Sequence, residues 1–193
     1  MKNIPAYDAE VEYLENTGKN WIDVKYIPSG NDNDFYASFM PTGYVESNSV
    51  LFGSNLTSHK CYSVVRYGTN QQCSIKNGGY TPSSGAIDIP LNSKYDFTVL
   101  RDGYCKVNDF EATIDVSKNT GAETSMPVKI FSDGNTQRYT KGRIYYLKWV
   151  KGNKVVLDLI PVRKDDEGFL YDKVSHKLYG AKGTGKLIIG PDL

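Results

Sequence analysis

The sequence predicts an all-β protein, a sandwich or barrel with little or no helix. Its 193 residues contain 27 Val and Ile against 19 Ala and Leu, with 15 Tyr and 18 Gly. β-Branched and aromatic residues favour strands, and Gly favours tight turns. Short strand-like runs alternate with turn signals throughout, whereas no window of about 12 residues carries a helical apolar stripe. At this length we expect a single domain over 9–193, preceded by residues 1–8, which could form an arm.

The first part of the chain contains four single strand-like runs and one hairpin. The alternation is clearest at 35–40, where Phe35, Ala37 and Phe39 share one face. The expected strands are 10–14, 21–27, 35–40 and 50–52, followed by a hairpin over 61–75.

The middle of the chain contains a second predicted hairpin. Alternation over 95–101 leads into Asp102-Gly103, a pair that favours a two-residue turn because both positions need positive φ. The return strand is 104–107, and 110–116 and 128–131 are the next strands.

The densest β segment is 142–164. Its two runs, 144–150 and 155–160, carry apolar residues on both faces, which predicts central strands covered on both sides. Pro161 should end the second run, because it has no N–H to donate. Short strands at 168–171, 177–179 and 186–189 complete the set.

Three cysteines, Cys61, Cys73 and Cys105, leave at least one thiol without a disulfide partner. With a turn at 68–70, Cys73 would lie opposite residue 65 and not opposite Cys61, so a bridge between them is not expected. We interpret all three as small core residues.

Charge excludes some classes of partner. The net charge of +1 gives no broad electrostatic reason for binding nucleic acid or an anionic membrane. No run of about 18 apolar residues could span a bilayer, and residues 1–8 lack the apolar part of a signal peptide. The charge is nevertheless uneven, at −5 over 1–137 and +6 over 138–193. The basic part is either a solvated outer face or a contact surface for an acidic partner.

Several patterns imitate catalytic or metal sites. Residues 180–187 approach a phosphate-binding loop, but Leu187 stands where Ser or Thr would hold Mg²⁺. Glu10, Glu12 and Glu15 resemble the carboxylate strand of laminarinase-type glucanases, although Glu12 replaces the central Asp and almost no sequence precedes them.

The remaining polar candidates are weaker. His59 and His176 have no Cys or His at metal-ligand spacing. Asp32 and Asp34 lie in an oxygen-rich stretch that could hold Ca²⁺, although turn chemistry explains it as well. We therefore expect no cofactor and no assembled catalytic site.

Six segments of the chain carry a family likeness. They are 13–18 (YLENTG), 21–23 (WID), 141–146 (KGRIYY), 159–164 (LIPVRK), 168–175 (GFLYDKVS) and 183–185 (GTG). Through them the chain resembles the concanavalin A-like, or laminin-G-like, jelly-roll domains of gut bacteria and their phages. The resemblance implies two packed antiparallel sheets with the first and last strands adjacent. It implies no single function, because such folds host many.

Three functions follow as hypotheses. The first is a phage virion surface or decoration protein, made in the host cytoplasm and packed in many copies against other virion proteins; its absence from purified particles would contradict this. The second, compatible with the first, is a module that binds a host or mucus glycan through aromatic rings. The third is a glucanase that uses the Glu10 trio. The candidate stacking residues are Trp21, Tyr36, Tyr44, Tyr62, Tyr67 and Tyr80.

Overall fold

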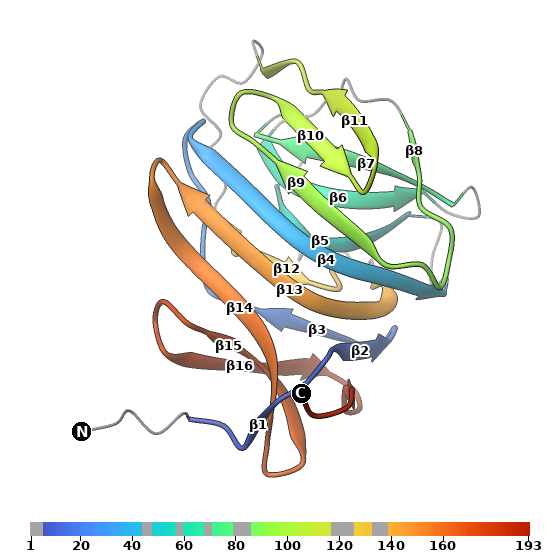
Figure 1. Cartoon of the computed structure of the whole chain (residues 1–193), viewed down its shortest axis with the longest axis vertical. Coiled ribbons are helices and arrows are strands. Elements are labelled where there is room, and N and C mark those ends of the chain that lie inside the picture. The colour runs from blue at the N-terminus through green and yellow to red at the C-terminus, as the bar shows by residue number, and fades with distance from the viewer. Residues whose placement is uncertain are drawn as a thin grey trace.

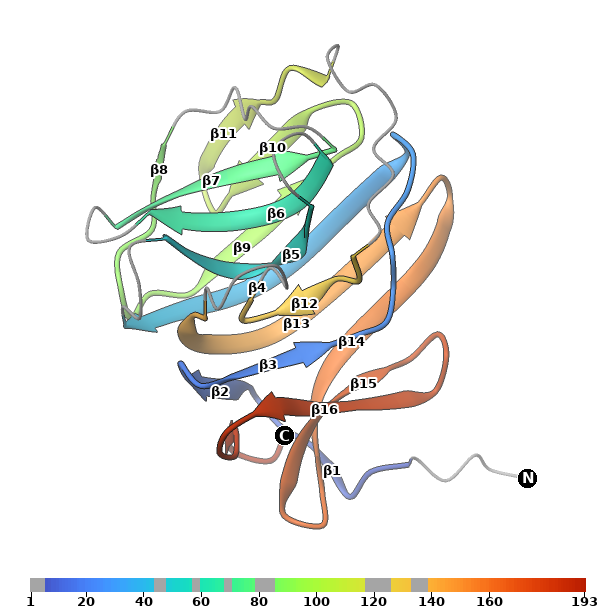
Figure 2. The same ribbon diagram turned by 180° about the vertical axis from the view of Figure 1, so that it is seen from behind.

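The computed structural model describes residues 6–43, 48–56, 60–67, 71–78, 86–116, 126–132 and 139–193. Of the described residues, 63% are in strands and 1% in helix, and the strands form two antiparallel layers of a jelly-roll sandwich (Figures 1 and 2). Along the first layer the order is β11 (Phe110–Thr113), β10 (Tyr104–Val107), β9 (Tyr95–Val99), β4 (Asn33–Gly43), β13 (Lys141–Lys151), β14 (Lys154–Lys164) and β15 (Glu167–Asp172).

Short strands extend this first layer, and seven strands form the second. β2 (Leu14–Thr17) pairs with β13, β17 (Ile188–Ile189) with β2, and β1 (Ala9–Glu10) with β14. The second layer runs β8 (Ile87–Asp88), β7 (Gln72–Asn77), β6 (Lys60–Tyr67), β5 (Asn48–Leu56), β12 (Lys129–Ile130), β3 (Asn20–Asp23) and β16 (Lys177–Gly183). β16 pairs with β15 of the first layer and with β3 of the second, which joins the layers at one side.

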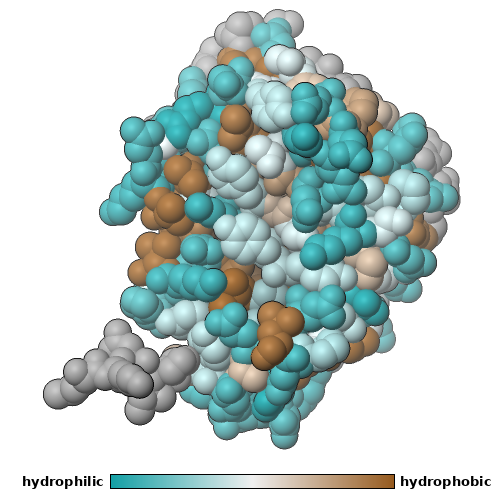
Figure 3. All heavy atoms as spheres, viewed as in Figure 1, coloured by the Kyte–Doolittle hydropathy of each residue, from teal (hydrophilic) through white to brown (hydrophobic). Residues whose placement is uncertain are grey.

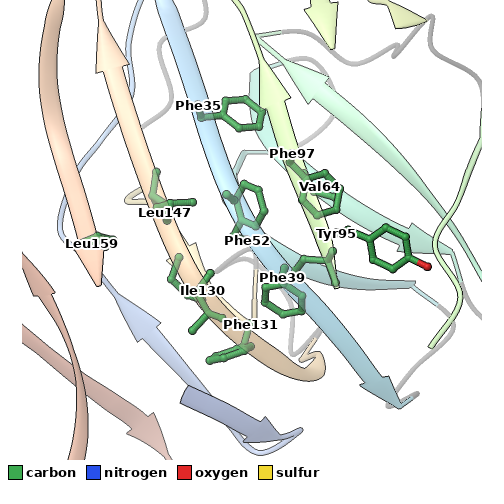
Figure 4. Packing of buried hydrophobic residues seen from close by; sticks show 14 of the residues in the cluster. Phe35, Phe39, Phe52, Val64, Tyr95, Phe97, Ile130, Phe131, Leu147 and Leu159 are labelled. Atoms are coloured by element: carbon green, nitrogen blue, oxygen red, sulfur yellow. The ribbon is translucent and has the colours of Figure 1, made fainter. Parts of the chain in front are cut away.

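Aromatic rings from both layers meet in the core between them (Figure 4). Phe35 of β4 contacts Phe52 of β5 edge-on at 5.9 Å, and Phe52 contacts Phe97 of β9 at 6.1 Å. All three are buried. Edge-to-face packing adds about 0.5–1.5 kcal/mol per pair to the gain from burying the rings, so these contacts hold the layers together.

A buried amide, Asn33 at the start of β4, links both layers. Its Oδ1 accepts a hydrogen bond from Trp149 Nε1 of β13 at 2.9 Å. Its Nδ2 donates to the Tyr62 hydroxyl of β6 at 3.2 Å and to the Ser29 carbonyl at 3.0 Å. The N–H of a buried Trp and the O–H of a buried Tyr each need a hydrogen-bond partner. Asn33 therefore supplies the acceptor for Trp149 and one hydrogen bond of the Tyr62 hydroxyl, which also donates to the Gly30 carbonyl.

Two expectations for the densest segment are wrong. In β13 the inward side chains Ile144, Leu147 and Trp149 are buried, but the outward ones are only half-buried, so just one face is covered. Pro161 does not end β14, which continues to Lys164. The Pro161 carbonyl accepts a hydrogen bond from Val11 N, on the side of β14 where the partner strand changes from β13 to β1. In an antiparallel strand the nitrogen and the carbonyl of one residue point to the same side. The Pro161 nitrogen, which carries no hydrogen, therefore faces this change of partner.

The predicted hairpins differ from the structure by single residues. The turn between β9 and β10 has three residues, because Leu100 N bonds to Tyr104 O, and Gly103, at φ 96°, supplies the positive-φ position. In the β6–β7 hairpin Cys73 lies opposite Arg66, one position from the expected residue 65. Cys73 and Cys105 are buried in the core, and the side chain of Cys61 lies outside the described residues.

The first and last strands are adjacent, as the resemblance implied. β17 pairs with β2, and Leu193 N donates to Glu10 O at 3.0 Å. Arg163 of β14 binds Asp192 at 2.9 Å. Of the suggested arm, residues 1–5 lie outside the described residues, and Asp8 N donates to Arg163 O. Among the described residues no helix is long and apolar enough to cross a bilayer.

Replacing Asn33 with Ala should destabilise the fold. The change leaves the buried Trp149 N–H without its acceptor, which costs about 1–3 kcal/mol. It also removes one hydrogen bond from the Tyr62 hydroxyl, which keeps its bond to the Gly30 carbonyl, and the packing of the amide itself. We expect urea denaturation to show a free energy of unfolding lower by about 2–5 kcal/mol. The control Asn153→Ala, at an exposed turn position, should change it by less than about 0.5 kcal/mol. An equally small effect at Asn33 would contradict its structural role.

Candidate functional site

A β-bulge in β13 brings two consecutive tyrosines to the same face of the sheet. The register of β13 against β4 shifts between Ile144 and Tyr146, so Tyr145 is the extra residue. In a regular strand neighbouring side chains point to opposite faces. Here Ile144 and Leu147 point inward, and Tyr145 and Tyr146 are both half-buried on the outer face. A bulge re-aims side chains in this way.

Two further tyrosines share this outer face. Tyr13 lies just before β2, and its ring centroid is 5.7 Å from that of Tyr145 in an edge-on contact. Tyr36 of β4 lies two residues from Ser38, the partner of Tyr146, and so is its diagonal neighbour. We call Tyr13, Tyr36, Tyr145 and Tyr146 the tyrosine face. Figure 3 shows this side of the molecule, with residues of intermediate hydropathy at its centre, hydrophilic ones over much of the rest and a group of hydrophobic ones at the left.

Desolvation affects the hydroxyls of the tyrosine face. Burial raises the pKa of Tyr146 to about 12, and the negative charge of Asp158 adds to the effect. Burial also raises the pKa of Tyr36 and of Tyr145. The rings are therefore neutral at physiological pH, and partly withdrawn from water.

A buried hydroxyl lies beside these rings. Ser38 lies on the outer side of β4, opposite Tyr146, and is only 8% exposed. Its Oγ makes no hydrogen bond within the part of the chain that the structure describes. Most buried polar atoms have a partner. The Ser38 hydroxyl is therefore an unsatisfied polar group, enclosed by the protein beside the tyrosine face.

A basic hollow of about 390 Å³ adjoins the tyrosine face at the Arg143 end. Arg143 lies over the Tyr13 ring, 4.1 Å from its centroid, and its Nε binds Glu15 at 2.7 Å. Lys94 lies 4.4 Å from the centroid of Tyr145. The hollow is lined by Glu15, Asn16, Thr17, Thr42, Asn92, Lys141 and Arg143.

The six predicted stacking residues lie in different places. Tyr36 belongs to the tyrosine face, whereas Trp21 lies on the outer side of β3 in the second layer, stacked on Tyr139 at 5.6 Å. Tyr62 is fully buried and bonds to Asn33 and to the Gly30 carbonyl, so it cannot stack on a ligand at the surface. The side chains of three lie outside the described residues: Tyr44, Tyr67 and Tyr80.

The expected Ca²⁺ candidates do not form an open acidic site. Asp34 is buried, and its carboxylate binds the Arg101 guanidinium at 2.6 Å and the Arg101 backbone N–H at 2.7 Å. The Asp32 carbonyl accepts from Gly152 N. No group of three potential metal ligands occurs among the described residues.

The carboxylate trio does not share a strand. Glu10 belongs to β1 and Glu15 to β2, two strands with different partners, and Glu12 lies between them. Glu15 is bound to Arg143. The glucanase-like alternation of carboxylates is therefore absent from this part of the chain. Of the two histidines, His176 contacts the Tyr171 hydroxyl at 2.8 Å, and His59 lies outside the described residues.

Comparison with known proteins relates the chain to other structures by fold. No protein-family model and no curated protein matches the sequence. A candidate carbohydrate-binding protein from Bacteroides ovatus matches with a TM-score of 0.59 and 11% identity. The match covers 93% of this chain but 60% of that protein. A heptameric SAP-like pentraxin from Limulus polyphemus gives 0.54 and 13% identity, covering 98% and 97% of the two chains.

These likenesses show the fold. A third match, the extracellular region of zebrafish Gpr126/Adgrg6, has a TM-score of 0.43 and 10% identity, and it covers 95% of this chain and 26% of that one. None of the three is described as a phage protein. The virion role, the partner virion proteins and the virion location therefore stay predictions.

The sequence pattern could not reveal the tyrosine face. A Tyr-Tyr pair in a regular strand places one ring on each face, so the pair at Tyr145 and Tyr146 indicated a strand covered on both sides. Tyr13 comes from a separate strand that reaches β13 only through the pairing of β2 with β13. The one signal in the sequence was the Tyr-Tyr pair, and it indicates a shared face only if the strand contains a bulge at that point.

Tyr146 should ionise near pH 12 in the folded protein, because burial opposes the charged form. The folded-state pKa is above the ordinary value of 10.0, so the stability contributed by this group is complete below pH 10 and is lost as pH rises through about 12. Tyrosinate absorbance is titrated against pH for the natural protein and for Tyr146→Phe. The difference between the two curves is the ionisation of Tyr146.

The same difference curve recorded in denaturant is the control, and its midpoint should move to the ordinary tyrosine value. A midpoint at that ordinary value in the folded protein would show that the ring is fully solvated.

Proposed function

We propose that this protein is a lectin-like module that binds a glycan on the tyrosine face and does no chemistry on it. The observation that carries the proposal is the bulge at Tyr145, which places Tyr145 and Tyr146 on one face beside Tyr36 and Tyr13. A sugar ring has an apolar face that packs on an aromatic ring and hydroxyls that need hydrogen bonds.

The surroundings of the rings support this proposal. Thr17, Thr42 and Asn92 line the adjoining hollow, and their hydroxyl and amide groups can bond sugar hydroxyls. An apolar surface with a few directed polar groups is the usual composition of a ligand site.

The structural neighbours also support the proposal. One of them is described as a candidate carbohydrate-binding protein, and this chain shares its fold over 93% of the present sequence. A place on a virion surface is compatible with glycan binding and rests on the sequence resemblance.

Replacing Tyr145 or Tyr146 with Ala should weaken binding to any glycan that the natural protein selects from an array of neutral, carboxylated and sulfated members. Central aromatic side chains carry much of the binding energy of such surfaces, so we expect Kd to rise about tenfold for each. Isothermal titration calorimetry measures the change, and circular dichroism checks that each variant is folded.

Trp21→Ala is the matched control for these variants, because Trp21 is an aromatic residue on the other layer. It should leave Kd within about twofold of the natural value. If Trp21→Ala abolished binding and the tyrosine variants did not, the site would lie on the second layer. If the array showed no binding down to millimolar affinity, the proposal would be wrong.

A further inference from the structure

The basic hollow beside the tyrosine face carries an excess of positive charge. Three cations surround it, since Lys141 and Arg143 line it and Lys94 lies over the neighbouring Tyr145 ring. Glu15 is the carboxylate in its wall. Glu12 is exposed, and its charge acts on Tyr145 from outside the hollow.

Glu15 already forms an ion pair with Arg143. The two side chains meet at 2.7 Å and are 17% and 31% exposed, respectively. Burial by itself would lower the pKa of Arg143, but the hydrogen bond and the charge of Glu15 outweigh it and raise that pKa. This pair is therefore fixed and neutral overall, and it leaves Lys141 and Lys94 as the cations that a ligand can use.

Lys141 is held in position by the strands on either side of it. It is the first residue of β13, paired with Thr17 of β2 on one side and Gly43 of β4 on the other. A Cβ on residue 43 would come within 2.9 Å of Lys141 Cδ, so Gly43 provides the room for the lysine stem. Glu15 lines the same hollow, but its carboxylate is bound to Arg143. Within the described ranges no carboxylate forms an ion pair with Lys141, so its ammonium group is held in place and not directly neutralised there.

The hollow also offers neutral hydrogen-bonding groups. Thr17, Thr42 and Asn92 line it together with Lys141. The Asn92 backbone is in the left-handed region at φ 61° and is anchored by a bond from its N–H to the Pro41 carbonyl. Hydroxyl and amide side chains of this kind recognise polar substituents around a charged group.

We propose that the glycan is acidic, and that its carboxylate or sulfate group occupies the basic hollow beside Lys141 while the sugar ring packs on Tyr13 and Tyr145. This inference rests on the proposed function, whose binding surface it extends. The geometry joins the two parts directly, because Arg143 both lines the hollow and lies over Tyr13. An ammonium group binds such anions as a point charge and strengthens their hydrogen bonds.

The opposite end of the tyrosine face does not offer the same site. Lys148 lies over Tyr36, but it is paired in register with Asp158 of β14, so a carboxylate is already its neighbour. The two ends thus differ in free positive charge, which makes Lys148 a control for Lys141.

Matched probes test the inference. Binding of oligogalacturonate is compared with that of its methyl ester, and binding of dextran sulfate with that of dextran, so that each pair differs only in negative charge. The variants are Lys141→Gln, Lys94→Gln and, as the control with the same loss of charge, Lys148→Gln. Calorimetry at low and high salt measures Kd, because charge pairing at an exposed site is screened by salt.

We expect an acidic probe to bind at least tenfold more tightly than its neutral partner. Lys141→Gln and Lys94→Gln should each weaken the acidic probe about three- to tenfold and leave the neutral one unchanged. Lys148→Gln should change neither by more than about twofold. The pair that responds shows whether the anion is a carboxylate or a sulfate.

Three results would overturn the inference. Equal binding of acidic and neutral glycans would leave the proposed function intact and remove the acidic ligand. An equal loss in all three lysine variants would show a general charge effect and no site at the hollow. Failure of every neutral, carboxylated and sulfated glycan to bind would remove the proposed function itself, and this inference with it.

Discussion

The buried amide of Asn33 is the interaction on which the rest of the sandwich depends. Trp149 and Tyr62 are large, fully buried and come from opposite layers, and each carries a polar group that needs a partner in the core. Asn33 bonds to both. It also stands at the start of β4, so the same hydrogen bonds hold β4 and β13 in one register. The core is thus specified by hydrogen-bond geometry as well as by apolar packing.

The register of β4 against β13 decides what the outer face can do. With Trp149 fixed inward at one end and Ile144 inward at the other, the strand accommodates one residue more than its partner, and Tyr145 is that residue. The bulge turns a pair of tyrosines outward together. The candidate binding surface is therefore a consequence of how the core side of the same strand is held.

Charge has a similar dependence on pairing. The basic last part of the chain lies largely on β13 to β16, and most of its charges are solvated or paired, as Arg143 with Glu15 and Arg163 with Asp192. Lys141 differs because its neighbours across both strands are Thr17 and Gly43. Local compensation, and not the net charge of +1, determines where an anion could bind.

The sequence by itself determined that the chain is a β-protein, a sandwich or barrel, and where most strands lie, because period-two patterning and turn residues are local signals. The two packed sheets and the adjacent first and last strands were implied only by the family resemblance. It also indicated Tyr36. It did not indicate Tyr13, Tyr145 or Tyr146, and it indicated Tyr62 as a stacking residue although that side chain is fully buried. Whether a tyrosine is core or surface depends on partners far along the chain. Only the tertiary structure, through one extra residue in β13 and the pairing of β2 with it, brought the rings and Lys141 together.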